Sequence, residues 1–128
     1  MYNIYYAHHQ WKYGTHIEQY EIDLIKRYFP ESVVFNPATE LMTDPVLGEE
    51  AIMDECLERI RNSDIVIFSS MDGVVGTGVY HELEEARKNG KFIYYIFRNG
   101  LHSVFNVSIL EDAQRTDRVY ATVYESTY

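Results

Sequence analysis

The chain contains little of several things, and each shortage excludes a class of protein. Cys56 is the only cysteine among 128 residues, so no internal disulfide can form, which suits a reducing cytoplasm. No apolar run approaches the roughly 20 residues of a membrane-spanning helix. The amino terminus has no basic segment followed by a long apolar stretch, so we expect no secretory signal. We therefore predict a cytoplasmic protein with no membrane partner.

Basic residues are also scarce. Lysine and arginine number 11 against 20 aspartates and glutamates, and the formal net charge is −9. This balance disfavours binding to DNA or RNA, because such a site needs cations against the phosphates. A small anionic ligand remains compatible, since the amino terminus of a helix can hold one locally. We therefore predict no nucleic-acid polymer as a partner.

Apolar residues and tyrosines, by contrast, are plentiful. A hydrophobic fraction of 46% is typical of a globular protein and argues against disorder. The length suits one domain, residues 1–128, with a sizeable core. Tyrosine occurs 12 times, and we expect some rings in the core and others along a pocket or subunit contact.

Strand-like and helix-like segments alternate along the chain. The third and fourth strand patterns are near-continuous apolar runs, typical of parallel strands covered on both faces. The sequence therefore predicts an α/β fold, a small doubly wound, Rossmann-like or flavodoxin-like parallel sheet of about five strands with helices on both faces. The predicted strands are 1–6, 33–35, 64–70, 91–97 and 118–124, and the predicted helices are 15–28, 49–61 and 77–88, with a weak helix at about 107–114.

The first two predicted helices carry specific signals. Thr15 is expected to cap the first helix, with Glu18 completing a capping box. Cys56 falls on the predicted apolar face of the second helix, so we interpret it as a buried core thiol. The apolar face expected for the first helix consists of Ile17, Tyr20, Leu24 and Tyr28.

The most informative segment runs from Asp64 to Lys91. A buried-strand pattern leads into a glycine-rich turn at 72–78, which opens the helix that carries Glu82. Backbone N–H groups and the helix dipole suit such a junction to a polar ligand. The glycine spacing matches neither a Walker A motif nor a Rossmann fingerprint, so a plain tight turn is equally compatible. Three loops should converge at this edge of the sheet: 7–15, 36–48 and 69–78.

Carboxylates and histidines near this turn are the candidates for chemistry. Glu84 and Glu85 fit a solvated helix face, whereas Glu82 lies nearer the loop, where a carboxylate can act as nucleophile or acid/base group. His81 and Glu82 lack the second histidine of a metalloprotease helix, and adjacent side chains such as His8 and His9 point apart on extended backbone. We therefore predict no metal site and no cofactor.

Four fragments in order within residues 2–97 suggest a family. They are Ile4-Tyr5-Tyr6-Ala7, Phe35-Asn36-Pro37-Ala38, Ser63-Asp64-Ile-Val-Ile, and a block of Gly76-Thr77-Gly78, Glu82-Leu83, Ala86 and Gly90-Lys91. Together they resemble the nucleoside 2-deoxyribosyltransferase superfamily, which includes the deoxynucleoside 5′-monophosphate N-glycosidases. The last block is the most specific motif of that family.

The resemblance implies an enzyme that cleaves or transfers the N-glycosidic bond of a 2′-deoxynucleoside or its 5′-monophosphate. Glu82 would attack the anomeric carbon, Tyr5 would orient Glu82 or the sugar, and a second base or water would resolve the glycosyl-enzyme intermediate. The leaving base also needs a proton donor. Cys56 stands where the family usually has an aspartate, eight residues before Asp64, so we predict Asp72 as its replacement.

Other loop residues are expected to bind the substrate. His8 and Trp11 would stack on the base, although an ordinary packing role for Trp11 is equally compatible. A phosphate would lie against the glycine-loop amides or the helix start, near Arg98. The full predicted substrate-binding set is His8, Trp11, Asn36, Ser69, Gly73, Gly76, Thr77, Gly78 and Arg98.

Two readings of the function remain open from the sequence. The first is the enzyme, supported by Glu82, Tyr5 and the glycine loop. The second is a catalytically inactive module on the same fold that binds or senses a nucleotide, supported by the missing aspartate and the bulky first loop. The tyrosine content and the resemblance also suggest a homodimer or larger homo-oligomer whose neighbour completes the pocket.

Overall fold

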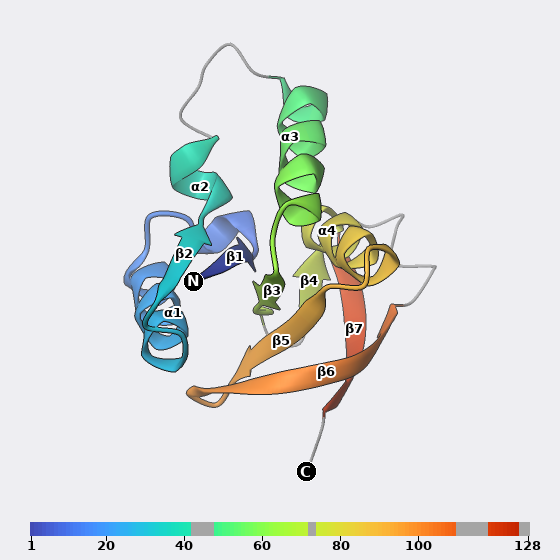
Figure 1. Cartoon of the computed structure of the whole chain (residues 1–128). Helices are drawn as coiled ribbons and strands as arrows, with labels where there is room; N and C mark the ends of the chain where they lie inside the picture. The colour runs from blue at the N-terminus through green and yellow to red at the C-terminus, as the bar shows by residue number, and fades with distance from the viewer. Residues whose placement is uncertain (42–47, 72–73, 110–117, 126–128) are drawn as a thin grey trace.

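The computed structural model describes residues 1–41, 48–71, 74–109 and 118–125 (Figure 1). Helices and strands alternate through most of the chain, as predicted for an α/β fold. The elements are β1 (Tyr2–Ala7), the 3-10 helix η1 (Gln10–Lys12), α1 (His16–Tyr28), β2 (Ser32–Phe35), α2 (Pro37–Glu40), α3 (Glu49–Arg61), β3 (Ile65–Phe68), β4 (Val74–Gly76), α4 (Thr77–Lys88), β5 (Phe92–Phe97), β6 (Gly100–Ile109) and β7 (Arg118–Glu125).

The strands form one sheet in the order β2-β1-β3-β5-β6-β7-β4. Neighbouring strands from β2 to β5 are parallel, and Tyr5 pairs with Phe35 on one side and Val66 on the other. The chain reverses direction across the sheet between β1 and β3, and in such sheets ligands bind beyond the carboxyl ends of the strands at that point. The predicted small Rossmann-like architecture is therefore confirmed.

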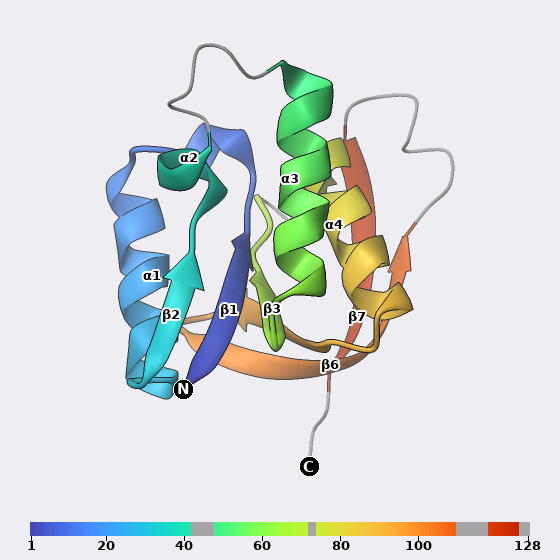
Figure 2. The ribbon, with the colours of Figure 1, turned by 45° about the horizontal axis from the view of Figure 1, so that its top comes forward.

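Helices cover both faces of the parallel strands, because side chains alternate between the faces along each strand. On one face, Ile4 and Tyr6 pack with Leu24 and Ile25 of α1. On the other face, Tyr5, Ala7, Val66 and Phe68 pack with residues of α3 and α4, which lie in front of the strands in Figure 2. Each buried strand thus contributes to two cores, which explains its near-continuous apolar sequence.

The predicted apolar face of α1 is wrong. Ile17, Tyr20 and Tyr28 are 46%, 40% and 53% exposed, although Leu24 is buried as expected. The helix instead buries Glu18 and Glu21 beside Leu24 and Ile25. Thr15 does cap the helix by accepting from the Glu18 N–H group, but the Glu18 carboxylate reaches the Gly14 N–H group instead of that of Thr15. The prediction failed because carboxylates usually face water, whereas Glu18 and Glu21 have the buried partners His8 and Lys12.

The carboxyl-terminal part departs from an all-parallel sheet. β5 and β6 form an antiparallel hairpin whose turn residues Arg98 and Asn99 have φ values of 48° and 64°, as a tight two-residue hairpin requires. β6 continues through Ile109, so the weak helix expected at about 107–114 is wrong for 107–109, and its other residues lie outside the described segments. β7 covers the last predicted strand. In the segments described, no helix is long and apolar enough to cross a bilayer.

Candidate functional site

Tyr5 and Glu82 meet in the core between the sheet and α4. β1 places the Tyr5 side chain on the face that α3 and α4 cover, and α4 carries Glu82 in its second turn. The Tyr5 hydroxyl donates a hydrogen bond to Oε2 of Glu82, and both side chains are buried. The structure therefore joins two residues that are 77 positions apart in the sequence, and that were both expected at the site.

Glu82 is an unusual carboxyl group because it is buried and forms no ion pair with any residue that the structure describes. Burial raises its pKa to about 8, and the Tyr5 hydrogen bond opposes this rise only in part. Among the described residues, no lysine or arginine forms an ion pair with Glu82. At neutral pH Glu82 is therefore mainly in its neutral, protonated form, which can donate a proton.

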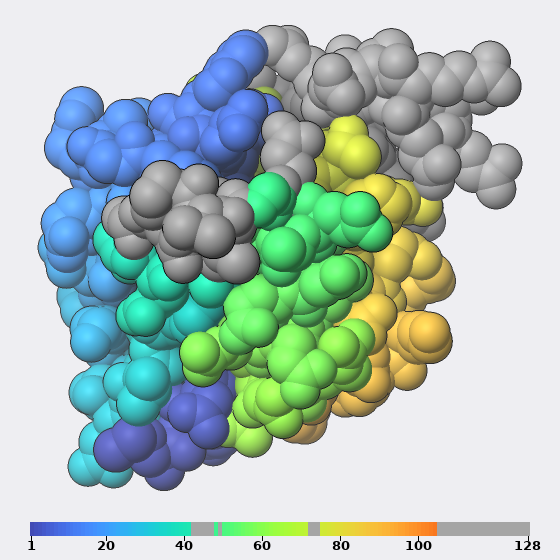
Figure 3. Space-filling view, turned by 90° about the horizontal axis from the view of Figure 1, so that it is seen from above, coloured from blue at the N-terminus to red at the C-terminus, as the bar shows by residue number. Residues whose placement is uncertain are grey.

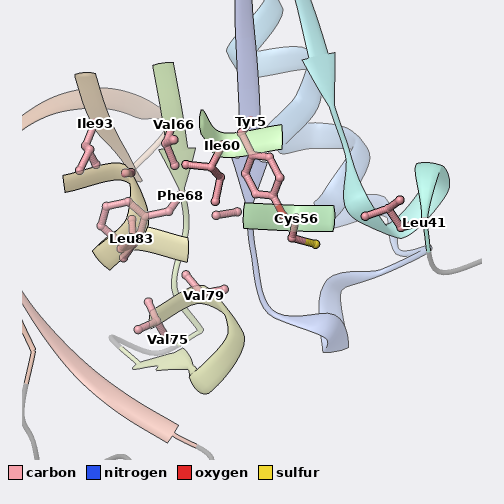
Figure 4. Packing of buried hydrophobic residues seen from close by; sticks show 12 residues of the cluster. Tyr5, Leu41, Cys56, Ile60, Val66, Phe68, Val75, Val79, Leu83 and Ile93 are labelled. Carbon is pink, nitrogen blue, oxygen red and sulfur yellow. The ribbon is translucent and has the colours of Figure 1, made fainter. Parts of the chain in front are cut away.

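Cys56 adjoins the same pair. It is buried on α3, and the Tyr5 ring points toward it (Figure 4). Tyr5 and Cys56 belong to one buried cluster. Burial, with a smaller contribution from the charge of Glu82, raises the pKa of the Cys56 thiol to about 11. Cys56 thus remains a neutral thiol, and it is a core residue that also contacts the site.

Tyr13 interacts electrostatically with the Glu82 site, which no sequence pattern indicated. It follows η1, is half-buried, and packs edge-on against His8 at 4.9 Å between ring centroids. Burial raises the pKa of Tyr13, and the charges of Glu82 and Cys56 add to the rise. The first loop was predicted to reach the site, but one tyrosine among 12 had no pattern to distinguish it.

A second buried tyrosine–glutamate pair lies on the opposite face of the sheet. The Tyr6 hydroxyl donates to Oε1 of Glu21, which also accepts from Ser69 at 2.7 Å. Lys12 Nζ adds a buried ion pair to Oε2 of Glu21 at 3.1 Å and donates to Ser69 Oγ at 2.8 Å. Ser69, predicted to bind substrate, is thus engaged in an internal network, and this pair differs from Tyr5–Glu82 by having a cation.

His8 is also engaged inside the protein, contrary to its expected role against a base. Its Nε2 lies 2.6 Å from Glu18 Oε2, and its Nδ1 faces the Tyr6 carbonyl at 3.2 Å. The ring stacks on Tyr6 at 3.8 Å, and burial lowers the pKa of His8. Trp11 is 59% exposed and packs edge-on against the His9 ring, so of these two aromatic residues only Trp11 presents a surface to solvent.

The glycine-loop residues are partly covered. Gly76 is the N-cap of α4, and a Cβ atom there would lie 3.1 Å from the His9 ring. A Cβ atom at Gly78 would make an ordinary contact with Met53. Thr77 begins α4, and its Oγ1 is buried with no hydrogen-bond partner among the described residues. The predicted Asp72 and Gly73 lie outside the described residues.

Two other predicted binding residues have local structural roles. Asn36 caps α2 by accepting from the Ala38 N–H group at 3.0 Å, which explains the Asn-Pro sequence after β2. Arg98 lies in the β5–β6 turn, where its guanidinium stacks on Phe97 at 5.0 Å. That turn is held against α1 by a hydrogen bond from Tyr20 to Asn99, whereas the walls around Glu82 come from β1, α3 and α4.

A surface groove lies elsewhere on the same two helices. It has a volume of about 760 Å³ and is lined by Met53 and Leu57 of α3 and by residues of α4 that include His81 and Glu84. Figure 3 shows this face, with α3 and α4 beside each other. Glu82 does not line the groove, because residues 81 and 84 lie on the outer side of α4 while Glu82 points inward.

Replacing Tyr5 with phenylalanine tests the contact at the centre of the site. The Tyr5 hydrogen bond lowers the pKa of Glu82, so Tyr5→Phe should raise that pKa above about 8. Loss of one buried hydrogen bond should also reduce the free energy of unfolding by about 1–2 kcal/mol. NMR titration of the carboxyl carbons checks the first effect and urea denaturation the second. An unchanged Glu82 titration would show that the hydroxyl does not contact the carboxyl.

Comparison with known proteins leaves the family open. Neither a protein-family model nor a curated protein matches the chain. The resemblance to the nucleoside 2-deoxyribosyltransferase superfamily therefore remains a prediction, and the site geometry has to support a function by itself.

Proposed function

We propose that the protein breaks or transfers the N-glycosidic bond of a 2′-deoxynucleoside or its 5′-monophosphate, with Glu82 as nucleophile. The observation that carries the proposal is the buried contact of the Tyr5 hydroxyl with a Glu82 carboxyl that forms no ion pair within the described part of the chain. Cleavage of an N-glycosidic bond develops positive charge on the sugar. An enclosed carboxylate without a fixed cation is suited to stabilise that charge when the sugar binds beside it.

The reaction would proceed in two displacements. Glu82 loses its proton, a carboxylate oxygen bonds to C1′, and the bond from C1′ to the base nitrogen breaks with its electron pair on the base. The base takes up a proton as it leaves. Water, or the nitrogen of a second base, then attacks C1′ and releases the Glu82 carboxylate, with loss of one proton from the nucleophile.

Tyr5 and Tyr13 would assist these steps in different ways. The Tyr5 hydroxyl holds one Glu82 oxygen and leaves the other for C1′. Tyr13 is half-buried and interacts electrostatically with Glu82, so its hydroxyl would help to set the charge of the site when a ligand binds. Asp72 stays our proposed proton donor for the base, at a position outside the described residues.

The test is the release of free base. The protein is incubated with each 2′-deoxynucleoside and each 5′-monophosphate, with and without an acceptor base, and the products are separated by chromatography. We expect free base in one series, and kcat/KM that rises with pH up to about 8 and then levels, because only ionised Glu82 attacks. A rate that falls through this range, or full activity in Glu82→Ala, would remove Glu82 as the nucleophile.

A second function is favoured by one observation. Cys56 provides a neutral thiol where a second carboxylate would assist catalysis, which supports a module that binds a nucleotide without cleaving it. Such a module would show ligand-dependent thermal stabilisation and no free base with any substrate. The same incubation and a thermal-shift series with the same compounds therefore separate the two functions.

We propose a homodimer or larger homo-oligomer in the cytoplasm. Phe92 on β5 is 73% exposed and supports an apolar subunit contact, and the lone buried Cys56 suits a reducing compartment. Light scattering of the purified chain measures the first of these directly.

A further inference from the structure

Lys12 joins three elements at the point where the sheet reverses direction. Its side chain is buried, with the residue only 6% exposed, although η1 lies at the surface end of β1. Its Nζ donates to Glu21 Oε2 at 3.1 Å, to Ser69 Oγ at 2.8 Å and to the Ser70 carbonyl at 2.9 Å. A lysine ammonium has three donors, so all of them are used. One cation thus ties the loop after β1 to α1 and to the chain leaving β3.

A second contact joins the same loops. We use "first loop" for residues 8–14. The His9 ring of the first loop lies against Gly76, close enough that a Cβ atom there would be 3.1 Å away. Gly76 is the N-cap of α4, the helix that carries Glu82. The first loop therefore touches the chain between β3 and α4 at both of its ends, near Ser70 and at Gly76.

Tyr13 follows Lys12 directly in this loop. Its ring packs on His8, and the charge of Glu82 adds to the rise in the pKa of Tyr13 that burial causes. Tyr5 from β1 donates to the Glu82 carboxyl, and Cys56 from α3 belongs to the same buried cluster as Tyr5. Lys12 is faced by Glu21, and Glu21 is shared with Tyr6 and Ser69. The first loop therefore lies against the start of the helix that carries Glu82, and Lys12 holds the loop to the chain after β3.

We propose that Lys12 is a positioning residue whose buried ammonium holds the first loop against the chain after β3 and so keeps the Glu82 site enclosed. The inference deepens the proposed function, since it concerns the same site. The role of Lys12 does not depend on catalysis, because a nucleotide-binding module would need the same enclosed site. Removal of the tether should let water reach Glu82 while Tyr5 and Cys56 stay in place.

The experiment reads the ionisation of Glu82 without any substrate. The free energy of unfolding is measured from pH 4 to 10 for a background and for the same background with Glu82→Gln, and the two curves are subtracted. The difference should change as pH rises from the ordinary carboxyl pKa of 4.5 and should level near 8, the raised pKa of Glu82 in the folded protein. We call the pH range over which the difference changes the window. Its upper end is the pKa of Glu82 in the folded protein, which rises with the burial of the carboxyl.

Two backgrounds isolate the tether from the buried charge. Glu21→Gln alone keeps Lys12, whereas Lys12→Met with Glu21→Gln removes the ammonium and leaves no unpaired carboxylate at position 21. We expect the second background to lower the upper end of the window by more than about one pH unit, because water enters. Lys12→Arg should keep it near 8, as should the control Lys26→Met on the exposed side of α1.

The outcomes separate a positioning role from general stabilisation. A uniform loss of stability with the window still ending near pH 8 would overturn the proposal, since Glu82 would remain enclosed without the tether. The rate at which Cys56 reacts with a thiol reagent gives an independent reading. It should rise in the Lys12→Met background more than the change in unfolding free energy predicts. Base release that fails in every variant would count against the proposed enzyme and leave this result unaffected.

Discussion

Glu82→Gln is expected to stabilise the folded protein above pH 8 while abolishing release of the base. The unfolded chain ionises Glu82 near pH 4.5, whereas the folded chain keeps the proton until pH is about 8. The folded pKa is the higher one, so the stability present below pH 4.5 is lost progressively between these two values. At about 1.4 kcal/mol per pH unit, the full loss is on the order of 5 kcal/mol. A glutamine at this position is never ionised, so the variant does not undergo this loss of stability.

Loss of turnover is the other half of the same prediction. Glutamine keeps an oxygen that can accept from Tyr5, so the packing is preserved. It cannot form the glycosyl ester, and kcat should fall by about a thousand-fold or more. Urea denaturation at pH 5 and pH 9, together with base release, measures both effects. Glu50→Gln on the exposed start of α3 is the control and should change neither.

The pH comparison decides the prediction. If Glu82→Gln changed the free energy of unfolding equally at pH 5 and pH 9, the carboxyl would not be held as a neutral acid in the folded protein. If it stabilised the protein at pH 9 but left turnover intact, Glu82 would be a buried structural residue. The combination of higher stability and lost activity is the signature of a group kept for function at a cost in stability.

Lys12→Met is expected to cost about 3–5 kcal/mol of stability, the second large effect. The substitution leaves the Glu21 carboxylate buried with no cation, and breaking a buried ion pair by removing one partner is costly. Methionine fills much of the same volume, so little of the loss comes from a cavity. Denaturation at pH 7 measures the change, and the exposed Lys26→Met should stay within about 0.5 kcal/mol of the parent.

The double variant distinguishes charge from packing. Lys12→Met with Glu21→Gln should recover a large part of the loss, because a glutamine oxygen can still accept from Tyr6 and Ser69 without a buried charge. If the double variant were as unstable as Lys12→Met, the cost would come from packing, and the ion pair would not be the reason that these residues are buried.

Much of the fold could be predicted from local patterns. The helices at 49–61 and 77–88 begin and end at the predicted residues, because each is bounded by clear glycine or asparagine signals. The apolar face of α1 could not be predicted in this way. Its buried residues include Glu18 and Glu21, and burial of a carboxylate depends on partners that lie on other elements.

The candidate site, like the fold, was predicted only in part from the sequence. The sequence by itself determined the alternation of strands and helices and the junction that opens α4, because these follow from periodicity and glycine placement. The family resemblance suggested Tyr5 as a candidate beside Glu82. Only the tertiary structure decided that Tyr5 joins Glu82 within the cluster that holds Cys56, that His8 and Ser69 are engaged inside the protein, and that Lys12 is buried. The physical reason is that burial and charge compensation are properties of neighbours in space, and those neighbours come from segments far apart in the chain.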